Sequence, residues 1–129
     1  MKGSKGEPDS QGVVTVAEYL VLIYTDETAQ AAMGEAEFGE MLAAHKQFQE
    51  RNGSAVRGGQ ALRPTETATA IRADGDGVAV TDGAFLETKE ALGGYYLIEA
   101  ADLDAALAIA KQVPFGSGGG LEVRPIWPM

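Results

Sequence analysis

Residues Thr81–Glu99 read TDGAFLETKEALGGYYLIE, and no other part of the chain constrains the fold as tightly. The segment places an Asp-Gly pair, a cluster of acidic and basic side chains and a diglycine directly before an apolar run. Asp82 and Gly83 suit a tight turn, because Asp bonds nearby backbone and glycine adopts positive φ. Tyr95–Ala100 has the length and composition of a buried strand. We expect residues 85–92 to form a short helix or turn, which the diglycine ends.

The rest of the chain predicts further strands and two helices around this segment. The apolar run Tyr19–Tyr24 does not alternate with polar residues, which predicts a strand buried on both faces. A helix is expected over residues 35–51, and a second one begins after Asp102, a good N-cap, and ends before Pro114. Other strands are expected around Ser54–Arg57, at Thr67–Ala73 and Val78–Thr81, joined by a hairpin turn at Asp74–Gly77, and at Leu121–Arg124.

This order of elements predicts an α+β fold, a ferredoxin-like βαββαβ pattern with an inserted β-hairpin. Two helices can cover only one face of such a sheet. Because Tyr19–Tyr24 and Tyr95–Ile98 are apolar on both faces, the second face needs a cover, since large exposed apolar patches are unfavourable in a monomer. The same face of a second copy would provide one, which predicts a two-fold homodimer.

Composition limits the partners that the chain can have. Its 129 residues suffice for one domain, and we expect residues 1–14 to be a flexible N-terminal extension and 15–129 to be the domain. With 10 Lys and Arg against 19 Asp and Glu, the net charge is −9, so we expect neither nucleic acid nor membrane as a partner. The chain has no cysteine and one histidine, which argues against a metal site and fits a cytoplasmic protein.

The run Asp82–Glu90 resembles the DGPF signature, in its fuller form DGPFAETKE, of the YCII-related family, with Ala84 at the proline position. The resemblance continues through the following strand into the next helix, so residues 15–129 are identified as a YCII-related, DGPF-type domain. The resemblance implies a dimeric α+β barrel. It also implies a pocket in which a His–Asp pair works, and in longer members the histidine lies on the helix that holds His45 here.

His45 and Asp82 are therefore the candidate catalytic residues, and each has an alternative interpretation. The expected inward stripe of the first helix is Phe38, Met41, Leu42, His45 and Phe48. His45 can act as an acid or base near neutral pH, or it can be a core histidine bonded to a backbone carbonyl. Asp82 can orient its imidazole, or it can simply bond its own backbone in the Asp-Gly turn.

Four other residues are candidate ligand-binding residues. Glu87 and Lys89 match the charged part of the family signature and can form a polar rim for an anionic or hydroxylated small ligand. They can equally be a solvated charge cluster. Phe85 and Tyr24 can line an aromatic pocket, or they can pack in the core and the dimer interface.

Two functions remain open beside a purely structural dimer whose pocket is vestigial, and whether the protein is an enzyme is left undecided. One is a cofactor-independent enzyme of isomerase or lyase type, in which His45 and Asp82 do acid–base chemistry on a small polar or aromatic substrate. This follows by analogy with the wider superfamily, which includes lactone isomerases and monooxygenases. The other is a non-catalytic ligand-binding or regulatory accessory dimer, because DGPF-type domains are similar to those encoded beside sigma factors.

Overall fold

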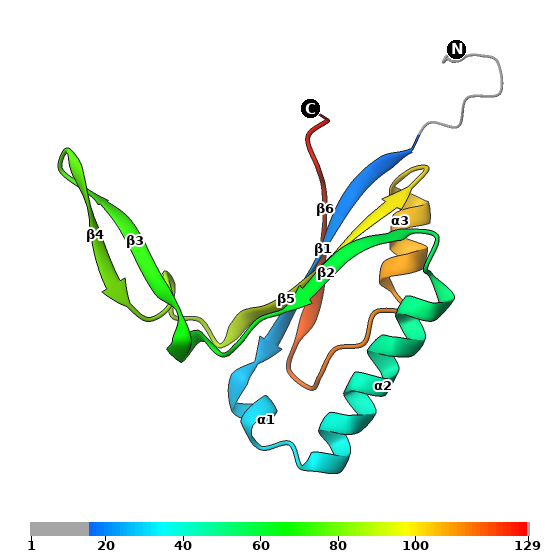
Figure 1. The fold of residues 1–129 in the computed structure, drawn as a ribbon, viewed down its shortest axis with the longest axis horizontal. Coiled ribbons are helices and arrows are strands. Elements are labelled where there is room, and N and C mark those ends of the chain that lie inside the picture. The colour runs from blue at the N-terminus through cyan, green and yellow to red at the C-terminus, as the bar shows by residue number, and fades with distance from the viewer. Residues whose placement is uncertain (1–15, 129) are drawn as a thin grey trace.

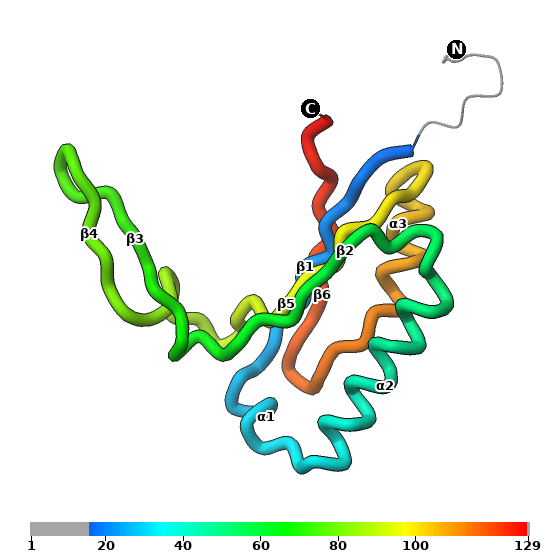
Figure 2. The backbone as a smooth tube through the Cα atoms, in the orientation of Figure 1, coloured from blue at the N-terminus to red at the C-terminus, as the bar shows by residue number. Residues whose placement is uncertain are grey.

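A four-stranded antiparallel sheet forms the centre of the molecule (Figure 1). The computed structural model describes residues 16–128, so the extension predicted over residues 1–14 lies outside the described residues. The sheet has the order β2-β5-β1-β6, and its strands are β1 (Ala17–Asp26), β2 (Val56–Ala61), β5 (Glu90–Ala100) and β6 (Gly120–Pro125). Strands β1 and β5 pair along their whole length, from Ala17 with Ala100 to Asp26 with Glu90. Figure 2 shows the chain path that makes the two central strands neighbours.

Two longer helices lie on the same side of this sheet (Figure 1). They are α2 (Glu35–Arg51) and α3 (Leu103–Ala110), and a short α1 (Glu27–Ala31) precedes them. The predicted helix over residues 35–51 is confirmed. So is the cap of the second helix, because the Asp102 carboxylate accepts a hydrogen bond from the Ala105 backbone N–H at 2.9 Å. The structure is thus α+β and consistent with the predicted ferredoxin-like class.

The predicted hairpin forms a separate two-stranded sheet of β3 (Thr69–Asp74) and β4 (Gly77–Asp82). A short 3₁₀ turn, Thr65–Thr67, precedes it. Gly75 has φ +61° at the tip of the hairpin, a conformation that favours glycine in a tight turn. The hairpin stands away from the main sheet, on the side opposite α2 and α3 (Figure 1).

Of the two alternatives for residues 85–92, a short helix or a turn, no helix forms, and the diglycine does not end an element. Residues 83–89 are bends and irregular loop, and β5 begins at Glu90 and runs through Gly93 and Gly94. The glycines are needed inside the strand, because neighbouring strands approach closely. A Cβ at Gly93 would lie 2.4 Å from the Thr25 hydroxyl oxygen, and one at Gly94 2.9 Å from the Gln60 carbonyl oxygen.

The two faces of the sheet are buried to different degrees. The helix-covered face holds the core, whose largest fully buried side chains are Phe48, Ile98 and Val21. Alternation along the strands turns Leu20, Leu22, Tyr95 and Leu97 to the opposite face, where they are only half-buried. Within residues 16–128 helices lie against one face of the sheet, as expected, and burial of the opposite face by a second copy stays a prediction.

Candidate functional site

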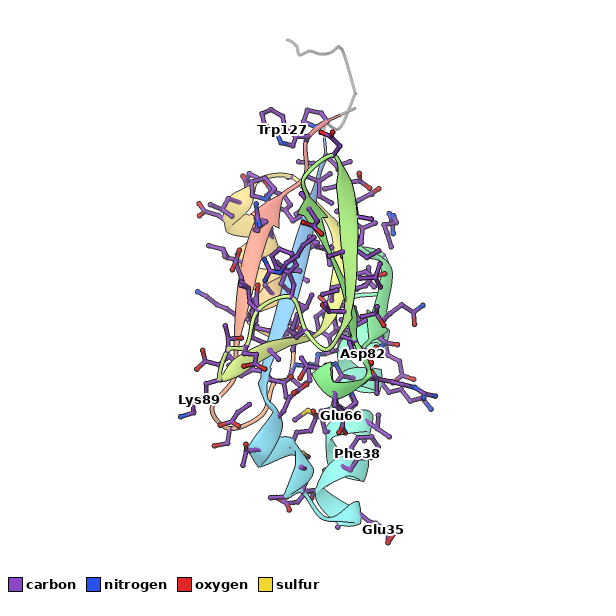
Figure 3. The ribbon with its side chains drawn as sticks, turned by 90° about the vertical axis from the view of Figure 1, so that its left-hand side faces the viewer. Glu35, Phe38, Glu66, Asp82, Lys89 and Trp127 are labelled. Carbon is purple, nitrogen blue, oxygen red and sulfur yellow. The ribbon has the colours of Figure 1, made fainter. Side chains whose placement is uncertain are left out.

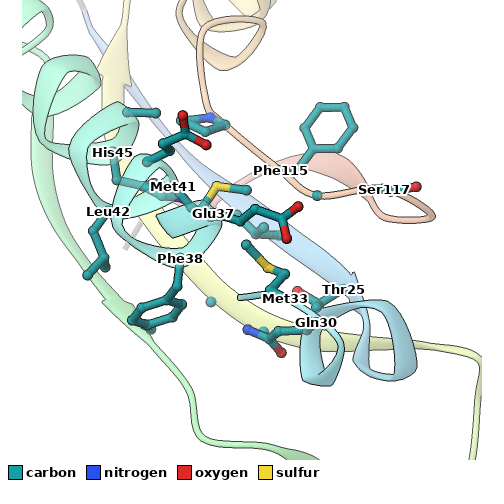
Figure 4. A pocket seen from close by; sticks show the side chains of 18 of the residues that line it. Thr25, Gln30, Met33, Glu37, Phe38, Met41, Leu42, His45, Phe115 and Ser117 are labelled. Atoms are coloured by element: carbon teal, nitrogen blue, oxygen red, sulfur yellow. The ribbon is translucent and has the colours of Figure 1, made fainter. Parts of the chain in front are cut away.

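A pocket of about 810 Å³ lies at one end of the molecule, between the first half of α2 and the sheet (Figure 4). Its apolar lining comes mainly from long or aromatic side chains, among them Met33, Phe38, Met41, Leu42 and Phe115. Strands β2 and β5 contribute Gly59, Gly93 and Gly94, and the loop between α3 and β6 contributes residues 114–117. The pocket is therefore built from segments that are far apart in the sequence.

The tilt of α2 against the sheet opens this pocket. Near the end of the helix, Phe48 is fully buried, whereas Phe38 and Leu42 nearer its start are 50% and 55% exposed. The prediction that the whole stripe faces the core is therefore wrong for Phe38 and Leu42. Helical spacing puts these side chains on one face, but only the second half of that face has the sheet against it.

His45 lies at the transition between the buried and the open half of α2, and it lines the pocket. Its Nδ1 is 2.9 Å from the hydroxyl oxygen of Tyr96, a buried residue of β5. Gln49, one turn further along α2, donates a hydrogen bond from Nε2 to the same oxygen, also at 2.9 Å. Tyr96 is thus the partner of the imidazole, in place of the backbone carbonyl that a core histidine was expected to contact.

Partial burial lowers the pKa of His45 below its ordinary value. The cause is desolvation, which penalises the charged imidazolium relative to the neutral ring. His45 therefore favours the neutral form near pH 7, the form in which one ring nitrogen donates and the other accepts a hydrogen bond.

The structure does not bring Asp82 to His45 within one chain. Asp82 is the last residue of β4, exposed on the projecting hairpin (Figure 3), and it does not line the pocket. Among residues 16–128, His45 has no hydrogen bond or ion pair with a carboxylate. The pairing of these two residues stays a prediction, and this arrangement of a single chain does not provide it.

The four residues predicted to bind a ligand also lie outside the pocket lining. Glu87 and Lys89 are exposed in the bends that precede β5. Phe85 is 54% exposed, and the Arg72 guanidinium lies 3.8 Å above its ring. Tyr24 is half-buried in β1, next to a shift of register between Ile23 and Tyr24. Of the six predicted site residues, only His45 contributes to the pocket.

Sequence reasoning did not single out Gln49 and did not assign Tyr96 a role in orienting His45. One signal was available for Gln49, since it follows His45 by four residues on a helix and therefore lies on the same face. Nothing local indicates Tyr96, which is 51 residues from His45 in the sequence. The three polar groups meet only because β5 passes beneath α2.

Charge in the pocket is one-sided. Asp26, Glu37 and Glu40 are the carboxylates of the lining, and no Lys or Arg of residues 16–128 belongs to it. Two of these carboxylates already accept backbone hydrogen bonds at helix starts, Asp26 from Thr28 and Glu37 from Gly34. Among the described residues, no group of three or more His, Cys, Asp or Glu side chains could hold a metal ion.

Comparison with known proteins places this chain in a family. Residues 17–129 match the YCII-related domain. The chain belongs to the YCII-related family. An uncharacterized protein of Rhizobium meliloti (strain 1021) is 37% identical over 112 residues, which cover 84% of this chain and 90% of that protein. None of the helices within residues 16–128 combines the length and the apolar character needed to cross a membrane.

Proposed function

We propose that this YCII-related protein binds a small molecule in the pocket beside α2 and that His45 exchanges a proton with it. The observation that carries the proposal is the position of His45. The one histidine of the chain is half-buried, is held by a buried tyrosine and opens on a pocket of about 810 Å³. A titratable group with a lowered pKa in such a pocket is a typical feature of an active site.

The reaction class that fits best is an isomerisation or elimination that needs no cofactor. The lining combines an apolar wall of methionine and phenylalanine side chains with a single imidazole, which suits proton transfer on a small polar or aromatic substrate. The pairing of His45 with Asp82 remains part of this proposal only if contact between two chains brings the carboxylate to the pocket.

Proton transfer can be tested with carbonyl compounds whose α-hydrogens exchange with solvent. Phenylacetone and γ-butyrolactone would be incubated with the protein in D₂O, and loss of the α-proton signal followed by NMR. We expect the wild-type protein to accelerate α-proton exchange above the rate in buffer alone. With His45→Gln we expect exchange at the buffer rate. Lys46→Gln, an exposed neighbour on α2, is the matched control and should retain the activity. Equal exchange with His45→Gln and wild type would exclude His45 as the acid or base.

A non-catalytic ligand-binding protein is the second candidate. It is favoured by the position of Asp82, Glu87 and Lys89 outside the pocket lining and by the lack, among residues 16–128, of any ion pair between His45 and a carboxylate. In this case a ligand would still bind to the pocket, but replacing His45 by Ala would leave its affinity unchanged. Isothermal titration of the wild-type protein and of His45→Ala with the same compound distinguishes the enzyme from the non-catalytic binding protein.

A homodimer is part of either proposal. The outer face of the sheet carries the half-buried Leu20, Leu22, Tyr95 and Leu97, and one face of the hairpin carries Ile71, Val78 and Val80, each at least 60% exposed. Register pairs Ile71 with Val80, so these apolar side chains lie side by side. A second copy that covers the outer sheet face would give the closed α+β barrel that the family resemblance implies.

The oligomeric state can be tested without assaying function. Sedimentation equilibrium should give twice the chain mass for the wild-type protein, and Leu97→Arg should shift it toward the monomer. Leu103→Arg is the matched control, because Leu103 is 49% exposed on α3, on the other side of the sheet. A monomeric wild-type protein at micromolar concentration would overturn the dimer.

The cytoplasmic location suggested by the lack of cysteine stays a prediction.

A further inference from the structure

The hydroxyl group of Tyr96 is the point at which the polar side chains of the pocket meet. Its oxygen is 2.9 Å from both His45 Nδ1 and Gln49 Nε2. The tyrosine ring is held tightly, because it is only 6% exposed and packs on Phe48 with ring centroids 4.9 Å apart. On the neighbouring strand, Gly59 pairs with Tyr96 and leaves the necessary space, since a Cβ there would lie 2.6 Å from the Tyr96 ring. The position of the hydroxyl is therefore fixed by the core.

The direction of the two hydrogen bonds follows from a count of protons. A hydroxyl has one proton to donate and two lone pairs, whereas the amide nitrogen of Gln49 can only donate. Gln49 therefore takes one lone pair of the Tyr96 oxygen. Among residues 16–128, the acceptor that remains for the Tyr96 proton is His45 Nδ1. Leaving a buried hydroxyl without an acceptor is unfavourable, which supports this arrangement.

We propose that Gln49 and Tyr96 hold neutral His45 in the tautomer that carries its proton on Nε2, so that the pocket offers a hydrogen-bond donor to its ligand. Nδ1 is occupied as an acceptor, and within residues 16–128 Nε2 has no hydrogen-bond partner. Tyr96 and Gln49 are positioning residues, since they act on a ligand through the imidazole. A neutral imidazole used in this way polarises a carbonyl oxygen by donating to it.

The chemistry of the lining defines the ligand that this donor suits. α2 brings Glu37 and Glu40 to the pocket, β1 brings Asp26, and β2, β5 and the loop of residues 114–117 bring no carboxylate, Lys or Arg. An anion would meet these carboxylates, and no Lys or Arg of residues 16–128 lines the pocket to compensate them, which disfavours a carboxylate or phosphate ligand. The site therefore selects an uncharged, largely apolar molecule with an acceptor such as a carbonyl oxygen. This statement about the ligand depends on the proposed function, whereas the tautomer does not.

The tautomer can be read directly from the imidazole nitrogens, because the chain has a single histidine. In untagged, ¹⁵N-labelled protein at pH 8, two-dimensional ¹H–¹⁵N spectra optimised for long-range couplings distinguish a protonated from an unprotonated ring nitrogen. We expect Nε2 to be protonated and Nδ1 to be unprotonated. An equal mixture of tautomers, or a proton on Nδ1, would overturn the proposal.

Reversing the polarity of residue 49 should reverse the tautomer. In Gln49→Glu the carboxylate can only accept, so the Tyr96 proton turns to it and the hydroxyl oxygen becomes an acceptor for His45 Nδ1–H. We expect the proton to move from Nε2 to Nδ1. Gln47→Glu is the matched control, with the same change at an exposed position of the same helix, and it should leave the tautomer unchanged. A retained Nε2 proton in a folded Gln49→Glu protein would contradict the network.

Tyr96→Phe provides a second variant in case the charge at residue 49 disturbs the fold. Without the hydroxyl, Nδ1 loses its donor, and we expect both tautomers to be populated and the pKa of His45 to rise. The rise is expected because the hydroxyl stabilises the neutral ring. A single tautomer in Tyr96→Phe, identical to that of the wild type, would show that another group fixes the proton.

The ligand class needs its own measurement. Acetophenone, cyclohexanone and benzoate would be titrated into wild-type protein while the ¹⁵Nε2 signal is followed. We expect the two ketones to shift this signal and benzoate to bind at least about tenfold more weakly, a difference of about 1.4 kcal/mol. Binding of benzoate with equal affinity would overturn the selection of uncharged ligands. If no compound binds, the proposed function fails while the tautomer measurement stands.

Discussion

The two halves of α2 carry the same apolar stripe but serve different purposes. In the second half, Phe48 is fully buried against the sheet and contacts Tyr96. In the first half, Phe38 and Leu42 are half-exposed and line the pocket. His45 lies between the two halves and lines the pocket as well. The difference teaches that helical spacing identifies a face, while the distance of the opposing sheet decides whether that face becomes core or pocket wall.

Replacing each of the two phenylalanines of α2 by alanine should show the difference between its two halves most clearly. Phe48→Ala leaves a cavity in the core and should lower the free energy of unfolding by about 3–5 kcal/mol. Phe38→Ala removes the same atoms from a side chain that is 50% exposed, so the loss should stay below about 1 kcal/mol. Urea denaturation followed by circular dichroism measures both. Equal losses would mean that the first half of α2 is packed as tightly as the second.

Substitutions at the adjacent glycines Gly58 and Gly59 test the close packing around Tyr96, the tyrosine that contacts both Phe48 and His45. Gly59→Ala places a Cβ 2.6 Å from the Tyr96 ring and 2.7 Å from the Tyr95 carbonyl oxygen, so we expect a loss of about 1–3 kcal/mol. Gly58→Ala, where a Cβ meets nothing within 4 Å, should change the free energy by less than about 0.5 kcal/mol. Thermal unfolding compares the two variants. If Gly58→Ala is the more damaging, the close approach to Tyr96 is not what requires glycine here.

The start of α2 should respond weakly to changes in its cap. The Glu37 carboxylate accepts a hydrogen bond from the Gly34 N–H at 3.2 Å, the part of a capping box that reaches back to the N-cap. Glu37→Ala should cost about 0.5 kcal/mol, because the bond is exposed to water. Glu35→Ala removes the same charge from the first turn without this bond and should cost less. Amide hydrogen exchange in residues 34–38 is the readout that should accelerate only in Glu37→Ala.

The smallest expected change in the free energy of unfolding is the one caused by protonation of His45 at acidic pH. Burial lowers the pKa of His45 in the folded state, so between the folded and unfolded values the unfolded chain binds more protons. Stability should therefore fall as the pH drops through the unfolded value of about 6.5, and level off below the folded one. Guanidinium unfolding between pH 8 and pH 5 measures it, with His45→Gln as the reference. A wild-type profile parallel to that of His45→Gln would exclude this contribution.

Prediction from the sequence succeeded where the signals are local. The bounds of α2 follow from its apolar period and the Asn52-Gly53 stop, and Asp102 caps α3 as an N-cap residue should. The hairpin turn at Asp74–Gly77 was predicted from the Asp-Gly-Asp-Gly sequence alone, and the paired strands confirm it. The family signature in residues 82–90 identified the chain, and the match over residues 17–129 confirms it.

Prediction failed where two distant strands decide the outcome. Gly93 and Gly94 were expected to end an element, yet they lie inside β5 because Thr25 and Gln60 come within contact distance of them. The place of Asp82 at the pocket stays a prediction, because in the single chain the hairpin carries it away from the main sheet. No local pattern shows how a hairpin is placed, since that depends on contacts outside its own residues.

The sequence by itself determined the family, the α+β class, the helix over residues 35–51 and His45 as the one histidine to consider. Only the tertiary structure decided that His45 contacts Tyr96 and Gln49 and that the first half of α2 lines a pocket. The physical reason is that periodicity and capping act over a few residues. The partners of a side chain, in contrast, are set by which strands pair and by how far a helix stands from them.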